Sequence, residues 1–330
     1  MVRARSLASS FTSLIALAAL GSSCDRDKPT ATTTSAAEPS RMPASAAPTA
    51  SPAKKNAPVV TFKEAGLATP ESIIHDDAAD VYLVSNVNGQ PTALDGNGFI
   101  SRLAPDGKVE NLRWVEGGKN QVTLNAPKGI GIMGDAIYVS DIDTVRIFDR
   151  KTGAPEGEVK IHGATYLNDL AVTTDGHILV SDSGVKPSAK GFEPTGTDAL
   201  YSIDKAKKVT PLAKSKDLNG PNGILPTTDK TWLVSFRGNE MYSVDSKGKK
   251  GDAKPLPMGT LDGIVMLPGG DVLVSSWQAN TIYRGRPGGD FAPMVEDVKS
   301  PADIGYDMKR NRVLVPLFES DEVRVYEVPR

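Results

Sequence analysis

The hydrophobic positions of this chain fall into short runs that repeat about every 40 residues. Each repeat opens with a turn and an apolar run, continues into a second run ending in Val-Ser or a close relative, and adds a third segment that alternates apolar and polar residues. The runs are rich in Val, Ile, Leu and Tyr and do not return every three or four positions, which favours strands over helices. We therefore expect an all-β fold built from repeated small sheets.

Six such repeats align with one another. They begin TPESIIHD, APKGIGIM, LNDLAVTTDG, PNGILPTTDK, LDGIVMLPGG and PADIGYDMKR. Their first inner-strand positions are Glu71, Lys128, Asn168, Asn222, Asp262 and Ala302, separated by 57, 40, 54, 40 and 40 residues. A period of about 40 residues in strands is typical of propeller blades, so the sequence predicts a six-bladed β-propeller with loop insertions in two blades.

The two ends of the repeat region complement each other. The last repeat has only three strands before the chain stops, and residues 59–62 (VVTF) precede the first repeat. We expect this segment to add the missing outer strand beside residues 323–328, which would seal the ring and hide a sheet edge. The predicted propeller spans residues 58–330.

The first residues have the pattern of an export signal. Arg3 and Arg5 precede the apolar run 14–20, which is too short to span a membrane, so residues 1–23 are predicted to be a signal peptide. Residues 24–57 are rich in Ala, Pro, Ser and Thr, with too little apolar area to offset ordering entropy, and are predicted to form a disordered tether. The protein is expected to be exported to the cell envelope or periplasm.

Cys24 is the only cysteine of the chain, so no disulfide can form within it. It follows Gly21-Ser22-Ser23, which resembles the lipobox of bacterial lipoproteins except that Gly21 stands where Leu is usual. We expect lipidation of Cys24 and anchoring in a membrane. The alternative is ordinary cleavage near residues 16–18, after which Cys24 is trimmed away.

Composition and missing motifs exclude several functions. The chain has 40 acidic and 38 basic residues, a net charge of −2 that becomes −4 if Arg3 and Arg5 leave with the signal peptide. Such a balance gives no indication of nucleic-acid binding. No glycine-rich phosphate loop and no G-x-S-x-G motif is present. His75, His162 and His177 have no ligand spacing and are expected at the surface or in turns.

Equivalent inner-strand positions of a propeller form a circle around the central channel. Four of the six positions carry oxygen donors, namely Glu71, Asn168, Asn222 and Asp262. Mixed carboxylate and amide oxygens suit Ca²⁺, although another divalent cation would also fit. A circle of acids would repel itself without a cation, which favours a metal site over simple turn caps.

These segments resemble a known family. PES at Glu71, LND at Asn168, PNG at Asn222 and LDG at Asp262 are similar to the senescence-marker-protein and gluconolactonase-like propellers, with paraoxonases and diisopropylfluorophosphatase as more distant relatives. The resemblance covers the whole predicted propeller. It implies a catalytic divalent cation, expected to be Ca²⁺, held by these four residues, and hydrolysis of a small lactone or ester.

Two positions of the circle lack an oxygen donor. Lys128 either neutralises the circle in place of a metal or holds a substrate carboxylate or a developing oxyanion. Ala302 offers no ligand, but the adjacent Asp303 and also Asp169 could support the ligands or simply cap turns. The resemblance implies that Asp262 is both ligand and possible base or nucleophile, with Lys128 as the second catalytic residue.

Loops after the second strands should form the mouth of the channel, because antiparallel strands return there. These loops supply candidate substrate contacts, namely Asn86, Asp141, Asp182, Phe236, Arg237, Trp277 and Phe318. For Asp141 and Asp182 a structural turn is the favoured alternative.

A non-catalytic function remains open. The segment APKGIGIMGDAIYVSDIDTVRIF resembles NHL-type propellers equally well, and such propellers use Asn and Asp at strand starts to cap backbone amides. The protein would then be a lipid-anchored binding platform for a protein or a cell-envelope ligand. In either case we expect a monomer whose only membrane contact is its anchor.

Overall fold

The computed structural model describes residues 57–189, 191–251 and 253–330. The predicted signal peptide, Cys24 and nearly all of the predicted tether lie outside these residues. Regular structure in the described part consists of strands and one short 3₁₀ helix, η1 (Lys216–Leu218), so the all-β prediction is confirmed. No helix of the described part is long and apolar enough to cross a bilayer.

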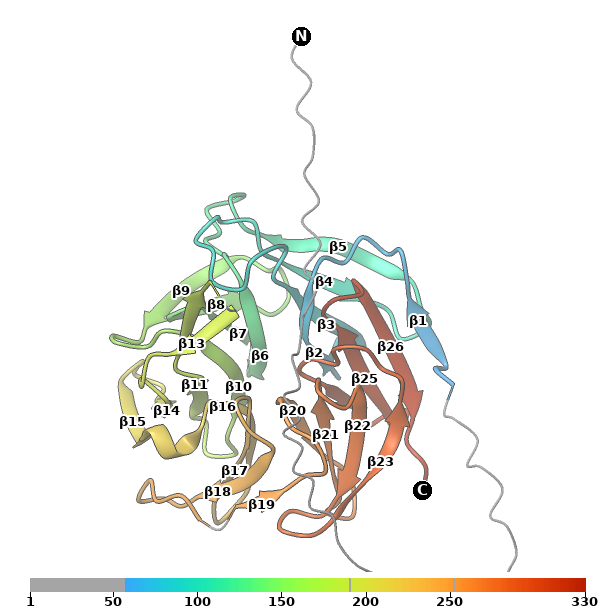
Figure 1. Cartoon of the computed structure of the whole chain (residues 1–330). Coiled ribbons are helices and arrows are strands. Elements are labelled where there is room, and N and C mark those ends of the chain that lie inside the picture. Colours follow the sequence, from blue (N-terminus) through green and yellow to red (C-terminus); the bar gives the residue numbers. More distant parts are fainter. Residues whose placement is uncertain (1–56, 190, 252) are drawn as a thin grey trace, which may run out of the picture. The chain divides into compact units, whose positions relative to one another are not determined.

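Six four-stranded antiparallel sheets form the blades of a propeller, as predicted (Figure 1). Blade 1 contains β2 (Pro70–Asp76), β3 (Val81–Asn86), β4 (Phe99–Leu103) and β5 (Val109–Glu116). Blade 2 contains β6 (Pro127–Met133), β7 (Ala136–Asp141), β8 (Thr144–Asp149) and β9 (Pro155–Lys160). Blade 3 contains β10 (Leu167–Val172), β11 (Ile178–Asp182), β14 (Ala199–Ile203) and β15 (Val209–Lys214).

The remaining blades follow in chain order. Blade 4 contains β16 (Pro221–Pro226), β17 (Thr231–Ser235), β18 (Glu240–Val244) and β19 (Lys254–Pro255). Blade 5 contains β20 (Leu261–Met266), β21 (Val272–Ser276), β22 (Thr281–Gly285) and β23 (Phe291–Glu296). Blade 6 contains β24 (Gly305–Asp307), β25 (Arg312–Leu317), β26 (Glu322–Glu327) and β1 (Val60–Phe62). The inner strands β2, β6, β10, β16, β20 and β24 touch in succession, and β24 touches β2, so the ring is closed.

The predicted closure of the ring by the N-terminal segment is confirmed. Strand β1 pairs antiparallel with β26, with Val60 opposite Val325 and Phe62 opposite Val323. Phe62 is buried against these valines. The first described strand therefore completes the last blade, and both chain ends of the propeller are held in one sheet.

Insertions account for the two long repeats. Blade 3 carries an additional hairpin between β11 and β14, formed by β12 (Val185–Ser188) and β13 (Gly191–Pro194). Blade 1 carries the loop of residues 87–98 between β3 and β4. Both insertions follow a second strand, so they lie at the same end of the propeller.

A β-bulge recurs near the start of the inner strands. In β2 the register shifts between Pro70 and Ile73, and β6, β10, β16 and β20 shift at the equivalent place. A bulge adds a residue and re-aims the side chains around it. Ile73 then packs into the core between blades, while the two residues before it occupy the channel end of the strand.

In three blades the second residue of the inner strand is followed by a glycine. Close packing at the axis explains this recurring glycine. A Cβ atom placed on Gly129 would lie 2.5 Å from the backbone nitrogen of Leu170 in the next blade. Only a residue without a side chain allows the two strands to approach this closely.

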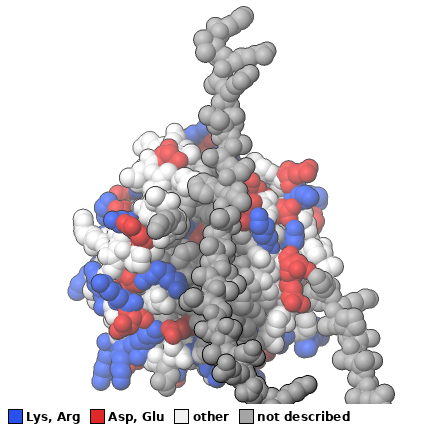
Figure 2. All heavy atoms as spheres, viewed as in Figure 1, with Lys and Arg blue, Asp and Glu red and all other residues white. Residues whose placement is uncertain are grey.

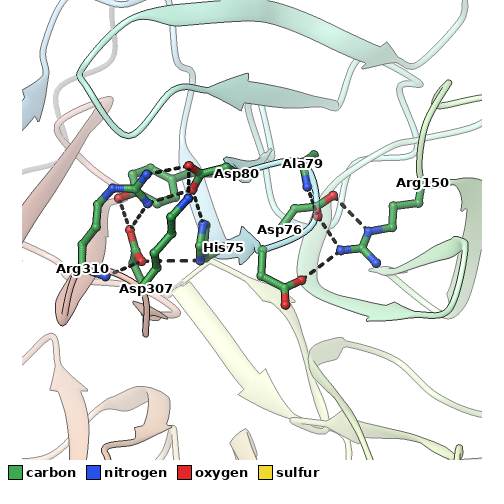
Figure 3. Close-up of polar contacts among 10 residues, drawn as sticks. His75, Asp76, Ala79, Asp80, Arg150, Asp307 and Arg310 are labelled. Carbon is green, nitrogen blue, oxygen red and sulfur yellow. Dashed lines mark hydrogen bonds and ion pairs between the residues drawn. The ribbon is translucent and has the colours of Figure 1, made fainter.

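Charged clamps join blade 1 to both of its neighbours at the other end of β2 (Figure 3). Arg310 of blade 6 binds Asp80 through two nitrogens, at 2.7 and 2.8 Å, and binds Asp307 at 2.9 Å. Arg150 of blade 2 donates to Asp76 at 3.1 Å. His75 lies within this cluster, 3.0 Å from Asp80, with a buried side chain, so the expectation of a surface position for it was wrong.

Candidate metal and catalytic site

Five inner strands present the predicted ring residues at the same structural position. Each is the second residue of its strand and lies directly before or within the bulge, namely Glu71, Lys128, Asn168, Asn222 and Asp262. All five side chains are buried. Residues at the same position of the sequence repeat therefore occupy equivalent positions around the channel.

Asp262 lies at the centre of a short chain of hydrogen bonds. Asn222 Nδ2 donates to Asp262 Oδ1 at 3.0 Å, and Trp277 Nε1 donates to Asp262 Oδ2 at 2.7 Å. The amide oxygen of Asn222 is buried and has no hydrogen-bond partner. Blades 4 and 5 thus bring an amide group and a carboxylate together.

Glu71 is also buried without full compensation, since its Oε2 atom has no hydrogen-bond partner. Burial raises the pKa of Glu71 well above its usual range, and the nearby charges of Asp262 and Asp303 raise it further. Burial likewise raises the pKa of Asp262 to about 8, with Asp303 adding to the shift. These carboxyls therefore lie within electrostatic reach of one another although they come from different blades.

Asn168 is held at the same phase in blade 3. Its Nδ2 atom donates to Ser183 Oγ at 3.1 Å, and Ser183 Oγ donates to the carbonyl of Pro221 at 2.8 Å. This tie fixes the amide group and leaves its oxygen as the atom that could face a cation.

Lys128 is fully buried beside the acids. Its Nζ donates to the carbonyl of Ala126 at 2.9 Å and lies 4.5 Å from the ring centre of Tyr166. Burial lowers the pKa of Lys128 to about 8, although Glu71 and Asp141 oppose the change. One such ammonium cannot neutralise several buried carboxylates at once.

Asp169 and Asp303 form a second pair of buried acids in the residues that follow the ring. Asp303 accepts a hydrogen bond from Ser72 Oγ. Asp169 also accepts from the backbone nitrogen of Ile224 at 2.6 Å. Burial raises the pKa of Asp303 to about 7 and that of Asp169 well above its usual range. Both acids support the inner strands and add negative charge beneath the ring.

The donor set fits a hard cation. Two buried oxygens without partners, Glu71 Oε2 and Asn222 Oδ1, belong to carboxylate and amide groups, which Ca²⁺ prefers. No three His, Cys, Asp or Glu side chains of the described residues lie close enough together to bind one metal, so the amides of Asn168 and Asn222 would have to take part. A bound cation would offset the repulsion that raises the pKa values of Glu71 and Asp262.

Most polar residues predicted at the mouth are used by the fold. Asn86 Oδ1 accepts from the nitrogen of Ala68, and Asp141 accepts from Ala126 and from Arg146 Nε. Asp182 accepts from the backbone nitrogens of Thr165, Tyr166 and Gly184. These three side chains occupy the last position of their second strands and cap the loop that enters the inner strand, which is the structural role considered for Asp141 and Asp182.

Arg237 is also engaged. Its guanidinium donates to the carbonyl of Ser183 at 2.6 Å and forms an ion pair with Asp198, so it ties blade 4 to blade 3. The structure therefore gives Asn86, Asp141 and Arg237 roles in blade architecture, and their substrate contacts remain predictions.

The aromatic residues predicted at the mouth make fewer polar contacts within the fold. Trp277 packs against Phe318 with ring centres 5.1 Å apart, and its nitrogen contacts Asp262. Phe236 is half-buried in the loop after β17. Blades 5 and 6 thus place an aromatic wall next to the ring.

Tyr166 is a site residue that the sequence reasoning missed. Its ring covers Lys128, and burial, followed by the charges of Glu71 and Asp262, raises its pKa well above its usual range. Phe192 of the β12–β13 hairpin packs edge-on against it at 5.5 Å. Alignment of the repeats could have pointed to Tyr166. It is the only large side chain two positions before the ring residue of any blade.

Comparison with known proteins identifies the fold. No family model and no curated protein matches the chain. A gluconolactonase from Xanthomonas campestris is 17% identical over 80% of this chain and 87% of its own, with a TM-score of 0.60. A luciferin-regenerating enzyme is 16% identical over 82% and 94%, with a TM-score of 0.59.

A virginiamycin B lyase from Staphylococcus aureus is also similar, at 15% identity over 81% of this chain and 98% of its own, with a TM-score of 0.55. Identities this low carry information about architecture and none about activity. At the level of architecture, the chain has the six-bladed propeller fold of the gluconolactonase-like proteins.

Proposed function

We propose that this protein is a calcium-dependent hydrolase of a small lactone or ester. The observation that carries the proposal is the buried ring itself, in which Glu71 and Asp262 have raised pKa values and Glu71 Oε2 and Asn222 Oδ1 lack partners. Proteins rarely leave such groups uncompensated, and those that do commonly use them at a functional site.

Glu71, Asn168, Asn222 and Asp262 would hold the cation. When bound, Ca²⁺ would polarise a carbonyl oxygen and favour attack on the carbonyl carbon. In hydrolysis the oxygen of water bonds to that carbon, the carbon–oxygen bond of the lactone or ester breaks, and the leaving oxygen gains the proton that the water loses.

Two residues of the chain would handle charge and protons. Asp262 is positioned by Asn222 and Trp277 and would accept the proton of the attacking water and pass it to the leaving oxygen. Lys128 would stabilise negative charge on the carbonyl oxygen, since its buried ammonium is pre-oriented by Ala126 and Tyr166.

Metal content and activity test the proposal together. The purified protein is expected to contain about one Ca²⁺ per chain, and a panel of lactones and esters should include a substrate that is hydrolysed with calcium and left intact after chelation. Asp271→Ala is a suitable control for substitutions of the ring acids, because Asp271 binds only surface arginines on blade 5. A calcium-free protein without activity on the panel would contradict the proposal.

The binding platform is the second candidate function. The backbone caps made by Asn86, Asp141 and Asp182 are the contacts that an NHL-type propeller would show. Such caps explain the ends of the second strands and leave the unpartnered oxygens of Glu71 and Asn222 unexplained. Retained ligand binding in a metal-free protein would favour the platform.

Export and anchoring belong to the same proposal. Lipidation at Cys24 would hold the propeller at a membrane through the segment that precedes β1. In the Cys24→Ser variant the protein should move from the membrane fraction to the soluble fraction of the envelope, and unchanged membrane association would count against the anchor.

A further inference from the structure

Charge is distributed unevenly around the propeller. Residues 204–254 contain eleven Lys and Arg against six Asp and Glu, a net charge of +5, whereas the rest of residues 57–330 contains 20 against 31, a net charge of −11. The basic segment comprises the outer strand β15 of blade 3 and all of blade 4. Figure 2 shows Lys and Arg gathered at the lower left, where Figure 1 labels β15 and β18.

Six lysines of this segment lie on three turns at one end of the propeller. Asn222 begins β16 at the ring end, so the turn between β16 and β17 lies at the opposite end, and the turns after β14 and β18 lie there too. We call these residues the lysine face, which consists of Lys205, Lys207, Lys208, Lys230, Lys247 and Lys249. All six are exposed.

The acids on the same turns are mostly occupied by the backbone. Asp204 accepts from the nitrogens of Ala206 and Lys208, and Asp245 accepts from those of Lys247 and Lys249. These contacts hold the carboxylates against the turns, and the side chains of Lys205 and Lys207 lie along Gly176 and Gly157. Asp229 is the remaining acid of these turns.

The lysine face is not neutralised by ion pairs, since none of its six members pairs with a carboxylate of the described residues. By contrast, Lys63, Lys119, Lys160, Lys186 and Lys299, which lie outside this face, each have an acidic partner. The turn after β18 also packs against blade 3, because Gly248 lies against the carbonyl of Leu212 in β15. The six lysines outnumber the three acids of the same turns, Asp204, Asp229 and Asp245, so this end of blades 3 and 4 carries a net positive charge.

We infer that the lysine face docks on an anionic membrane surface, which would be a second membrane contact besides the expected anchor. The lysines are exposed on turns of two adjacent blades, so they suit an array of lipid phosphates better than a single bound phosphate. Lysine ammonium groups are compact, hydrated point charges, and several near a membrane give additive, salt-sensitive attraction. A lipid tether of the kind proposed at Cys24 would keep the surface within reach of such a membrane.

This docking would orient the protein. The ring residues and the β12–β13 hairpin lie at the end of the blades opposite the lysine face. The channel end that carries Asp262 would thus face away from the lipid and remain open to solutes. The inference does not depend on the hydrolase proposal.

Vesicle binding tests the inference in the exported chain, residues 24–330 with Cys24→Ser to remove the lipid. The protein is mixed with vesicles of phosphatidylcholine alone or with 30% phosphatidylglycerol, and bound protein is measured by flotation. At low salt we expect at least tenfold tighter binding to the anionic vesicles, and at high salt that preference should disappear.

Two charge-matched variants locate the surface. Replacing Lys205, Lys207, Lys208, Lys247 and Lys249 by Gln should abolish the preference for anionic vesicles, whereas replacing Lys63, Lys119, Lys160, Lys186 and Lys299 by Gln should change it less than twofold. Thermal unfolding checks that both variants fold. Equal losses in the two variants, no anionic preference in the parent chain, or binding to heparin without binding to vesicles would each overturn the inference.

Discussion

Both ends of β2 carry clusters of acids, and the two clusters differ in their partners. At the ring end, Glu71 and Asp262 are buried with raised pKa values, and the charge of Lys128 opposes the shift in pKa only at Glu71. At the clamp end, Asp80 and Asp307 are bound by Arg310 (Figure 3). Burial would raise the pKa of Asp307, but hydrogen bonds from Tyr82 and Arg310 outweigh it, so the pKa falls.

The difference separates a functional cluster from a structural one. A guanidinium that binds each carboxylate stabilises the closed ring without needing any other ion. Carboxylates without such partners are stable only when protonated or when a cation binds them. The number of acids is similar at the two ends of β2. Whether an arginine binds them decides whether they have a structural or a functional role.

The largest expected effect is on catalysis. Asp262→Asn keeps the shape of the side chain and removes its charge, so we expect kcat to fall about 1,000-fold or more, because both the cation and the proton acceptor are weakened. Calcium content, measured on the same sample, should fall as well. Arg310→Met serves as the comparison at the clamp end and should leave kcat within about twofold; equal losses in both variants would erase the proposed distinction.

The second prediction concerns the clamp. Arg310→Met leaves the buried carboxylate of Asp307 without its guanidinium, and we expect the free energy of unfolding to drop by about 3 kcal/mol. Urea unfolding measures this. Lys309→Met is the matched control, since Lys309 makes only an exposed contact to Asp80 and its loss should cost less than about 1 kcal/mol.

The third prediction concerns calcium removal. If calcium is present at about 100 times its dissociation constant, chelation should lower the free energy of unfolding by roughly 3 kcal/mol. The loss should persist in Arg310→Met and vanish in Asp262→Asn, as followed by thermal unfolding with and without chelator. A chelator effect that survives in Asp262→Asn would place the cation elsewhere.

The fourth prediction concerns pH. Asp262 has a folded-state pKa of about 8, far above its unfolded value, so the calcium-free folded protein binds a proton that the unfolded chain releases. Its stability should therefore fall as pH rises from about 4 to 8. Asp307 has a lowered pKa and acts in the opposite sense, losing its contribution as pH falls through the acid range. In Asp262→Asn, stability measured across pH 5 to 8 should show a weaker decline.

The smallest effect is expected for Trp277→Phe. This change keeps the aromatic wall and removes the hydrogen bond to Asp262, so we expect roughly a five- to tenfold loss of kcat with little change in stability. A loss in thermal stability larger than the loss in kcat would assign Trp277 to packing.

Local sequence accounted for the architecture because each blade is specified by short-range pattern. Alternating apolar runs, turn residues and a 40-residue period predicted six blades, and residues 59–62 were correctly assigned to the outer strand of the last blade. The period also predicted which residues share a phase, which brought Glu71, Asn222 and Asp262 to attention. The predicted signal peptide, tether and Cys24 lipidation remain predictions.

Side-chain partners could not be deduced in this way. Asn86, Asp141 and Arg237 have the residue types of a binding site, but their oxygens and nitrogens are used by backbone groups of neighbouring loops and blades. Tyr166 has an ordinary type and gains its position next to Lys128 from the loop before β10.

The sequence by itself determined the strands, the number of blades and the residues that share a position in the inner strands, because these depend on periodicity along the chain. Only the tertiary structure decided which of the many acids are compensated and which are left buried without a partner, because ion pairs such as Arg310 with Asp80 join residues 230 positions apart. Pairing across blades depends on how the ring closes, and no local pattern records it.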